Sequence, residues 1–135
     1  MTRVTRRYRF AAAHRLESAA LTAKENRSVY GKCNNPYGHG HDYTLEVSVA
    51  GAPHPGTGRV IAPGSLDALV RCEALARLDA VSLNDLPEFA AEPATTENLA
   101  LAIERWLAAR WPEGWPPLCR IRIEETRRNH FELRR

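Results

Sequence analysis

Three histidines from two separate stretches of the chain have the type and spacing of a metal site. His39 and His41 are two residues apart, and on a β-strand this spacing puts both imidazoles on one face. His14 ends another alternating segment, with the parity of the apolar residues there. Three histidine nitrogens are the ligand set of a catalytic zinc with an open fourth position. If the two strands pair, we expect Zn²⁺ rather than calcium or magnesium, because imidazole suits zinc. The spacing of His39 and His41 alone is also compatible with two hydrogen-bonded histidines on the surface that bind no metal.

Cys33 precedes this histidine pair, in a stretch rich in glycine and asparagine. Two roles stay open for its thiol. It can be a fourth zinc ligand, which would make the site structural, or a proton acceptor whose pKa a nearby cation lowers. Cys72 and Cys119 are predicted to be small buried hydrophobic residues. Three widely spaced cysteines without a C-x-x-C motif favour reduced thiols over a disulfide framework.

One carboxylate is predicted to face the core. Glu125 follows two isoleucines of the same parity on a strand, and a buried carboxylate needs a partner. The partner is either an arginine or a ligand that offers paired N–H donors. By contrast, Thr95, Thr96 and Glu97 are explained by the N-cap and first turn of a helix. Asp79 follows a predicted helix and is interpreted as a cap or as an orienting residue.

The elements that must position these residues follow from hydrophobic periodicity. Period-two alternation predicts strands, and apolar residues at helical spacing predict two helices. The polar stretch 16–37 is predicted to be a long loop, a feature that is often functional. The strand–strand–helix–helix–strand–strand order predicts an α+β fold with an antiparallel sheet. The predicted strands cover residues 3–14, 41–49, 120–126 and 131–133, with a third strand in chain order beginning at 60–61, and the helices cover 66–78 and 96–111.

Composition limits the class of protein. A chain of 135 residues with 44% hydrophobic and 26% charged residues predicts one globular domain over 1–135. No apolar run is long enough for a membrane span and no apolar leader is visible, so we expect no membrane partner and a cytoplasmic location. The net charge of +3 is a weak excess. Arginines on the terminal strands are therefore interpreted as a solvated face balanced by glutamates, with no nucleic-acid partner.

Six motifs also stand in the order of a known family. They are FAAAH, YGKCNNPYGHGHDY, GTGRV, LDxxxLN, ATTENLA and IEET, and they extend over about residues 8–133. In this order they resemble the 6-pyruvoyl tetrahydropterin synthase family, which includes the bacterial 6-carboxytetrahydropterin synthases. The C-x5-H-G-H spacing resembles the pyruvoyl type more than the shorter C-x3-H-G-H of many carboxy-type enzymes. The product stays open, and with it the pathway, tetrahydropterin or queuosine biosynthesis.

The resemblance implies a fold, an assembly and a reaction. The fold is the tunnelling fold, with two helices on one face of an antiparallel sheet. Subunits would join their sheets into a barrel, and two trimeric rings would stack into a homohexamer. The implied enzyme is a zinc-dependent lyase that eliminates triphosphate from 7,8-dihydroneopterin triphosphate. The implied roles are zinc ligands for His14, His39 and His41, a catalytic thiolate for Cys33, a pterin anchor for Glu125, and positions close to the pterin for Thr95, Thr96 and Glu97.

The chain departs from the family pattern at one position of the implied catalytic relay. The family usually has Leu-Asp-His where this sequence has Leu78-Asp79-Ala80. In the family, Asp79 would hold that histidine, which is thought to activate the cysteine. Alanine cannot exchange a proton, and a general acid or base contributes about 10²–10⁴-fold to a rate. The chain is thus expected to be slow, to use another base such as His54 or His130, to run a variant reaction, or to bind pterin with little turnover. A smaller departure is Ala62-Pro63, where the family tends to have an acidic or amide residue before leucine.

Overall fold

A computed structural model describes residues 1–135 and contains one five-stranded sheet in the order β3-β1-β2-β4-β5. Two long strands, β1 (Thr2–His14) and β2 (His39–Gly51), run antiparallel along their whole length. The strands β4 (Leu118–Glu124) and β5 (His130–Arg134) continue the antiparallel pairing beside β2. The short β3 (Val81–Ser82) lies parallel to the end of β1. The sheet confirms the α+β, mainly antiparallel prediction.

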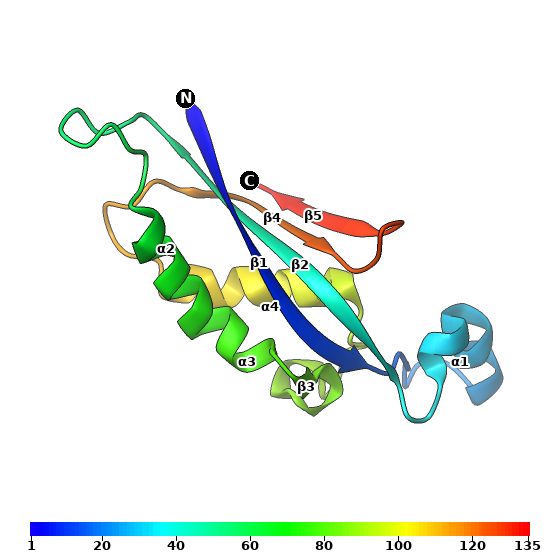
Figure 1. The fold of residues 1–135 in the computed structure, drawn as a ribbon. Helices are drawn as coiled ribbons and strands as arrows, with labels where there is room; N and C mark the ends of the chain where they lie inside the picture. The colour runs from blue at the N-terminus through cyan, green and yellow to red at the C-terminus, as the bar shows by residue number, and fades with distance from the viewer.

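The helices α2, α3 and α4 cover one face of this sheet (Figure 1). The segments α2 (Pro63–Val70) and α3 (Ala76–Leu78) are joined by a π-helical turn, and α4 (Thr96–Ala109) begins at its N-cap Thr95. A further helix, α1 (Ala23–Tyr30), lies beside the end of the β1–β2 pair. Short 3₁₀ turns cover Gly31–Asn34, Leu83–Asp85 and Pro87–Phe89. No helix has the length and apolar character needed to cross a membrane.

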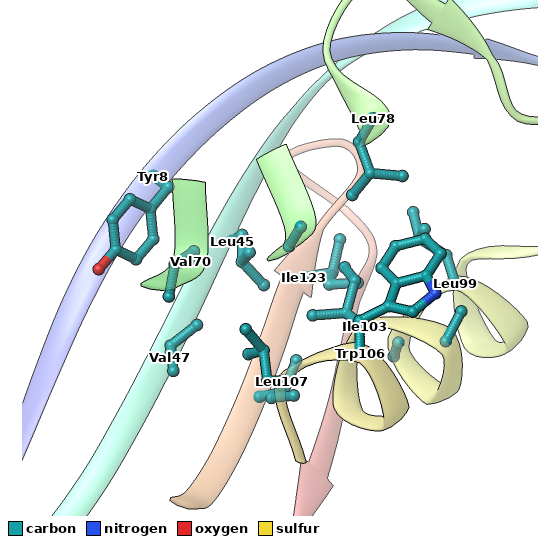
Figure 2. Close-up of a cluster of buried hydrophobic side chains, with 14 of the residues drawn as sticks. Tyr8, Leu45, Val47, Val70, Leu78, Leu99, Ile103, Trp106, Leu107 and Ile123 are labelled. Atoms are coloured by element: carbon teal, nitrogen blue, oxygen red, sulfur yellow. The ribbon is translucent and has the colours of Figure 1, made fainter. Parts of the chain in front are cut away.

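The core fills the space between the sheet and the helices (Figure 2). It contains 24 buried hydrophobic residues in one cluster. On β2, alternate residues such as Leu45 and Val47 are fully buried, while Ile103 and Leu107 bring the apolar stripe of α4 onto them. Burial of this apolar stripe is the main stabilising contribution to a helix of this length. The core therefore fixes α4 against the strands and, with it, the residues at its N-terminus.

The opposite face of the sheet carries a charged network. Glu46 on β2 lies 3.2 Å from Arg120 and 3.0 Å from Arg122, two arginines of β4. Arg120 also lies 2.6 Å from Glu132 on β5, and hydrogen bonds from Arg120 and then Arg134 lower the pKa of Glu132 to about 2. These arginines are paired with glutamates across neighbouring strands, as the interpretation of a balanced face predicts.

The stretch 16–37 differs from the predicted irregular loop, because it contains α1 and a 3₁₀ turn. The helix has no apolar stripe, and its only buried residue is Asn26, so hydrophobic periodicity could not reveal it. A local signal was present in Thr22 and Glu25. They form a reciprocal capping box, in which each side chain accepts from the other residue's backbone N–H.

The prediction of a strand at Val60 and Ile61 is wrong. Ile61 is buried in the core and Val60 packs against it, but no strand pairs with this segment. Two residues later Pro63 occupies the first turn of α2, where its fixed φ favours helix and its missing N–H costs nothing. The segment therefore leads from a bend into α2 without forming a strand.

The prediction that Cys72 is buried is also wrong, since its side chain is exposed, and Cys119 is only half-buried. Cys72 lies in the π-helical turn Arg71–Leu75. A π-turn inserts an extra residue into the helical repeat. The residues that remain buried along this helix recur every fourth position, at Leu66, Val70, Ala74 and Leu78. With this spacing, Cys72 lies on the side of the helix that faces away from the core.

Candidate metal and substrate site

The pairing of β1 with β2 brings the three histidines together. His14 lies directly opposite His39, and His41 lies opposite Ala12, so all three side chains share the helix-covered face. Their ring centroids are between 4.4 and 5.2 Å apart. Gly38 makes this approach possible, because a Cβ built there would lie 2.7 Å from the carbonyl oxygen of His14, and its φ is +67°.

The imidazole nitrogens are oriented for metal binding. Nδ1 of His14 lies 3.0 Å from the carbonyl oxygen of Ala94, which favours the tautomer with a free Nε2 lone pair. That Nε2 lies 3.2 Å from Nε2 of His41, close to the ~3.4 Å between two nitrogens on a tetrahedral zinc. Burial lowers the pKa of both His14 and His41. A lowered pKa keeps the rings neutral, the form that binds a cation.

Cys33 approaches the cluster from the 3₁₀ turn. Its carbonyl accepts a hydrogen bond from the backbone N–H of Leu16 at 2.7 Å, which ties the turn to the segment after β1. The thiol sulfur lies 2.9 Å from Nε2 of His39. Burial raises the pKa of Cys33, the carboxylate of Glu125 raises it further, and the positive charge of Lys32 opposes both. The thiol therefore needs an additional positive charge nearby to become a thiolate at neutral pH.

Glu125 completes the site from the end of β4. Its Oε1 accepts a hydrogen bond from the Thr96 hydroxyl at 3.1 Å. The same oxygen lies 3.7 Å from Nε2 of His14 and 3.5 Å from Nε2 of His41. No arginine pairs with this carboxylate, although its side chain is only 13% exposed. The sequence left two partners open for this carboxylate, an arginine or a ligand with paired N–H donors, and the structure has no arginine there.

The N-terminus of α4 carries Thr95, Thr96 and Glu97, for which the family resemblance implies positions close to the pterin. The Thr95 hydroxyl accepts from the backbone N–H of Asn98 at 3.2 Å, as expected of an N-cap. Thr96 is buried beside Glu125, whereas Glu97 is exposed in the first turn. Thr96 therefore contacts the carboxylate directly, and Thr95 holds the helix end in place.

The donor atoms fall into two overlapping groups that suit zinc. His14, Cys33 and His39 form one group, and His14, His41 and Glu125 form the other; within each group the ligand atoms lie within 4.8 Å of one another. Nitrogen, sulfur and carboxylate oxygen are all zinc donors. His14 belongs to both groups, and each group by itself offers three donors that fit one zinc ion.

Several sequence candidates lie outside this cluster. Asp79 accepts a hydrogen bond from the backbone N–H of Ala11 at 2.9 Å, and the N–H of Ala80 donates to the carbonyl of Ala11 at 2.6 Å. Both bonds extend the edge pairing of β1. Ala80 has a φ of +61°, unusual for a residue with a Cβ. His54 and His130 are exposed in a turn and at the start of β5.

Two participants in the site were missed by sequence reasoning. The carbonyl of Ala94 orients His14, and the charge of Lys32 acts on Cys33. Backbone carbonyls leave no signal in a sequence pattern. Lys32 directly precedes Cys33, and its position next to a candidate thiol was a usable signal.

Comparison with known proteins gives one consistent result. Residues 3–135 match the family model described as 6-pyruvoyl tetrahydropterin synthase. A 6-pyruvoyl tetrahydrobiopterin synthase of Poecilia reticulata is 45% identical over 93% of this chain and 85% of its own length. The human protein of the same name is 40% identical over 93% of this chain and 86% of its own length. A solved structure of Caenorhabditis elegans 6-pyruvoyl tetrahydropterin synthase superposes with a TM-score of 0.89 at 32% identity, covering 98% of this chain and 94% of that one.

Proposed function

Because the chain belongs to the 6-pyruvoyl tetrahydropterin synthase family, we propose that it is a zinc-dependent lyase. Its proposed substrate is 7,8-dihydroneopterin triphosphate, from which it eliminates triphosphate while the side chain is rearranged or cleaved. The observation that carries this proposal is a carboxylate that is 13% exposed and has no arginine partner, beside three imidazoles and a thiol. This arrangement offers a recognition group and a reaction centre in one site.

Glu125 is the proposed anchor for the pterin ring. The aminopyrimidinone edge of a pterin presents neighbouring N–H donors, and a carboxylate can accept both at once. Thr96 donates to one oxygen of this carboxylate and fixes its orientation, while Thr95 and Glu97 begin the helix that carries Thr96. The bound ring would then place its side chain toward the histidines.

The zinc ligands proposed for this site are His14, His39 and His41. When bound, zinc would polarise the hydroxyl groups of the substrate side chain and acidify the adjacent C–H bonds as a Lewis acid. Cys33 is the proposed group that takes and returns a proton at these carbons. Its sulfur lies 2.9 Å from Nε2 of His39, so the thiol is held at the edge of the cluster rather than in solvent.

The sheet edges favour the proposed assembly of subunits. Strand β3 covers β1 only at Ala12 and Ala13, and β5 forms the other edge of the sheet. Most of the long strand β1 therefore presents unpaired backbone groups, which another strand can pair with. We propose that copies of this chain join edge to edge into a trimeric barrel and that two barrels stack into a hexamer.

A pterin-binding homologue with weak or altered turnover is the second candidate, and Ala80 favours it. The Ala80 side chain offers no proton, and the Asp79 carboxylate is occupied by the backbone of β1. A cavity of about 440 Å³ lies beside Ala80, and Asp42 and Ser82 are among the residues that line it. This candidate predicts tight pterin binding with little release of triphosphate. If A80H leaves turnover unchanged and the wild type is already fast, the second candidate is wrong.

The experiment that tests the proposed function is incubation of purified protein with 7,8-dihydroneopterin triphosphate, followed by mass spectrometry of the products. We expect release of triphosphate and a pyruvoyl-type, carboxy-type or cleaved pterin product. The matched variant is H39A, which removes one proposed zinc ligand and should abolish release. A metal-free wild type whose H39A variant behaves identically would contradict the proposal.

A further inference from the structure

The segment that carries Cys33 has no buried hydrophobic side chain to anchor it. It consists of α1 and the 3₁₀ turn Gly31–Asn34, and the only buried residue of each is an asparagine, Asn26 in α1 and Asn34 in the turn. Figure 1 shows α1 apart from the helices that cover the sheet. Segments with few buried apolar contacts open locally at low cost. Polar contacts therefore have to fix the position of Cys33 relative to the core.

Asn34 connects this turn to a residue that packs on the core. Its side-chain N–H₂ donates to the carbonyl oxygen of Leu16 at 2.8 Å, while the backbone N–H of Leu16 donates to the carbonyl oxygen of Cys33 at 2.7 Å. The side chain of Leu16 packs against the hydrophobic core. Leu16 also follows His14 by two residues. The turn is therefore tied to the segment that directly continues the strand of a proposed zinc ligand.

Leu16 is itself held in place from the other side. The preceding residue, Arg15, donates its backbone N–H to Oδ1 of Asn84 at 2.7 Å and accepts from Nδ2 of Asn84 at 2.7 Å. The Asn84 amide thus continues the edge pairing of β1 beyond the short strand β3. The backbone N–H and carbonyl groups of both Arg15 and Leu16 are all hydrogen-bonded. These two residues form a fixed bridge between the end of β1 and the Cys33 turn.

We propose that Asn34 is a positioning residue, whose hydrogen bond to Leu16 holds the Cys33 thiol against the histidine cluster. This inference rests on the proposed function, in which the thiol moves a proton. The sulfur lies 2.9 Å from Nε2 of His39, and a displacement of about 1 Å at a reacting group can lower a rate about 10²-fold. The proposed pterin anchor, Glu125, bonds to α4 instead. Asn34 therefore controls proton transfer and not pterin binding.

The test measures how fast iodoacetamide alkylates each of the three cysteines in chelator-treated protein at one fixed pH, resolved by peptide mass spectrometry. In N34A we expect Cys33 to react about two- to tenfold faster, the factor that corresponds to one neutral hydrogen bond. The exposed Cys72 and the half-buried Cys119 are internal references, and their rates should stay unchanged. In the zinc-loaded protein, N34A should lower kcat for 7,8-dihydroneopterin triphosphate by up to about 10²-fold and leave KM unchanged.

Two further variants separate positioning from stability. The control N26A removes the other buried asparagine of the segment, whose side chain bonds only to the backbone of Ser18, Leu21 and Thr22. It should lower Tm at least as far as N34A does, and leave the Cys33 alkylation rate unchanged. N34D keeps the size of the side chain but turns an acceptor toward the Leu16 carbonyl, so it should alkylate at Cys33 at least as fast as N34A.

Several outcomes would overturn the inference. Wild-type alkylation of Cys33 in N34A or N34D would show that the amide does not hold the turn. Equal acceleration at Cys33 and Cys119 would show a loss of global stability instead of a local release, and an N26A variant as reactive at Cys33 as N34A would show the same. A wild type without turnover would refute the proposed function, whereas the alkylation rates of the zinc-free protein would still decide whether Asn34 positions the thiol.

Discussion

Substitution of Glu125 by glutamine isolates the interaction on which pterin recognition depends. E125Q keeps the size of the side chain and removes its charge. In the structure the Glu125 carboxylate accepts from Thr96 and faces two imidazoles, and no arginine compensates it. The carboxylate is therefore free to accept the paired N–H donors of a pterin ring. Glutamine presents one acceptor and one N–H₂ group, so one of the ligand's donors meets another donor.

The size of the effect follows from this loss. A hydrogen bond to a charged group contributes about 1.5–3 kcal/mol, and a neutral one about 0.5–1.5 kcal/mol. E125Q weakens one such bond and replaces the other by a donor facing a donor, a total of about 2–4 kcal/mol. We therefore expect the Kd for neopterin to rise about 30- to 1000-fold. Fluorescence titration of neopterin measures this change.

Glu124 offers a matched control for E125Q. It is the preceding residue on the same strand, it faces the opposite side of the sheet, and its carboxylate lies 3.8 Å from Arg122. E124Q changes the same charge at almost the same place and should leave the Kd unchanged. If E125Q binds neopterin as tightly as E124Q does, Glu125 is not the pterin anchor and the recognition argument fails.

Three further predictions concern the thiol, the imidazoles and the core. C33A should lower turnover by about 10²–10⁴-fold, as expected for loss of a proton-transfer group, while the zinc content stays constant; loss of zinc in C33A would show that Cys33 is a ligand of a structural site. Burial lowers the pKa of His14 and His41 in the folded protein below the ordinary value of 6.5. Just below pH 6.5 these two residues therefore bind more protons in the unfolded chain than in the folded one. Chelator-treated protein should accordingly lose stability as the pH falls from about 6.5. Urea unfolding at pH 7.5 and pH 5.5 measures this loss, and equal stabilities would argue against neutral buried imidazoles. I103A removes a fully buried side chain and should lower the free energy of unfolding by about 2–5 kcal/mol; a cost below about 1 kcal/mol in denaturant titration would mean that α4 is not packed on the sheet as described.

The common face of the three histidines could be predicted because it depends on parity alone. The i, i+2 spacing of His39 and His41 and the matching parity of His14 fix the face on which each side chain lies. Antiparallel pairing of the two strands then places His14 opposite His39. The inward direction of Glu125 followed from the same argument, although β4 ends one residue earlier, at Glu124.

Other features were beyond the reach of periodicity. The helix α1 buries only Asn26, so only its capping box marks it in the sequence. The π-helical turn shifted Cys72 out of the buried stripe, because a sequence does not show where a helix takes an extra residue per turn. The short parallel strand β3 depends on long-range contact with the end of β1, and two residues carry too little pattern to predict it.

The most direct test of the account is anomalous X-ray diffraction at the zinc edge on crystals of the protein purified without added chelator. The account predicts one zinc ion per chain, bound by Nε2 of His14 and by the imidazoles of His39 and His41, with a position left open for a ligand. An ion enclosed by Cys33 as a fourth protein ligand, or three histidines without any metal, would contradict it.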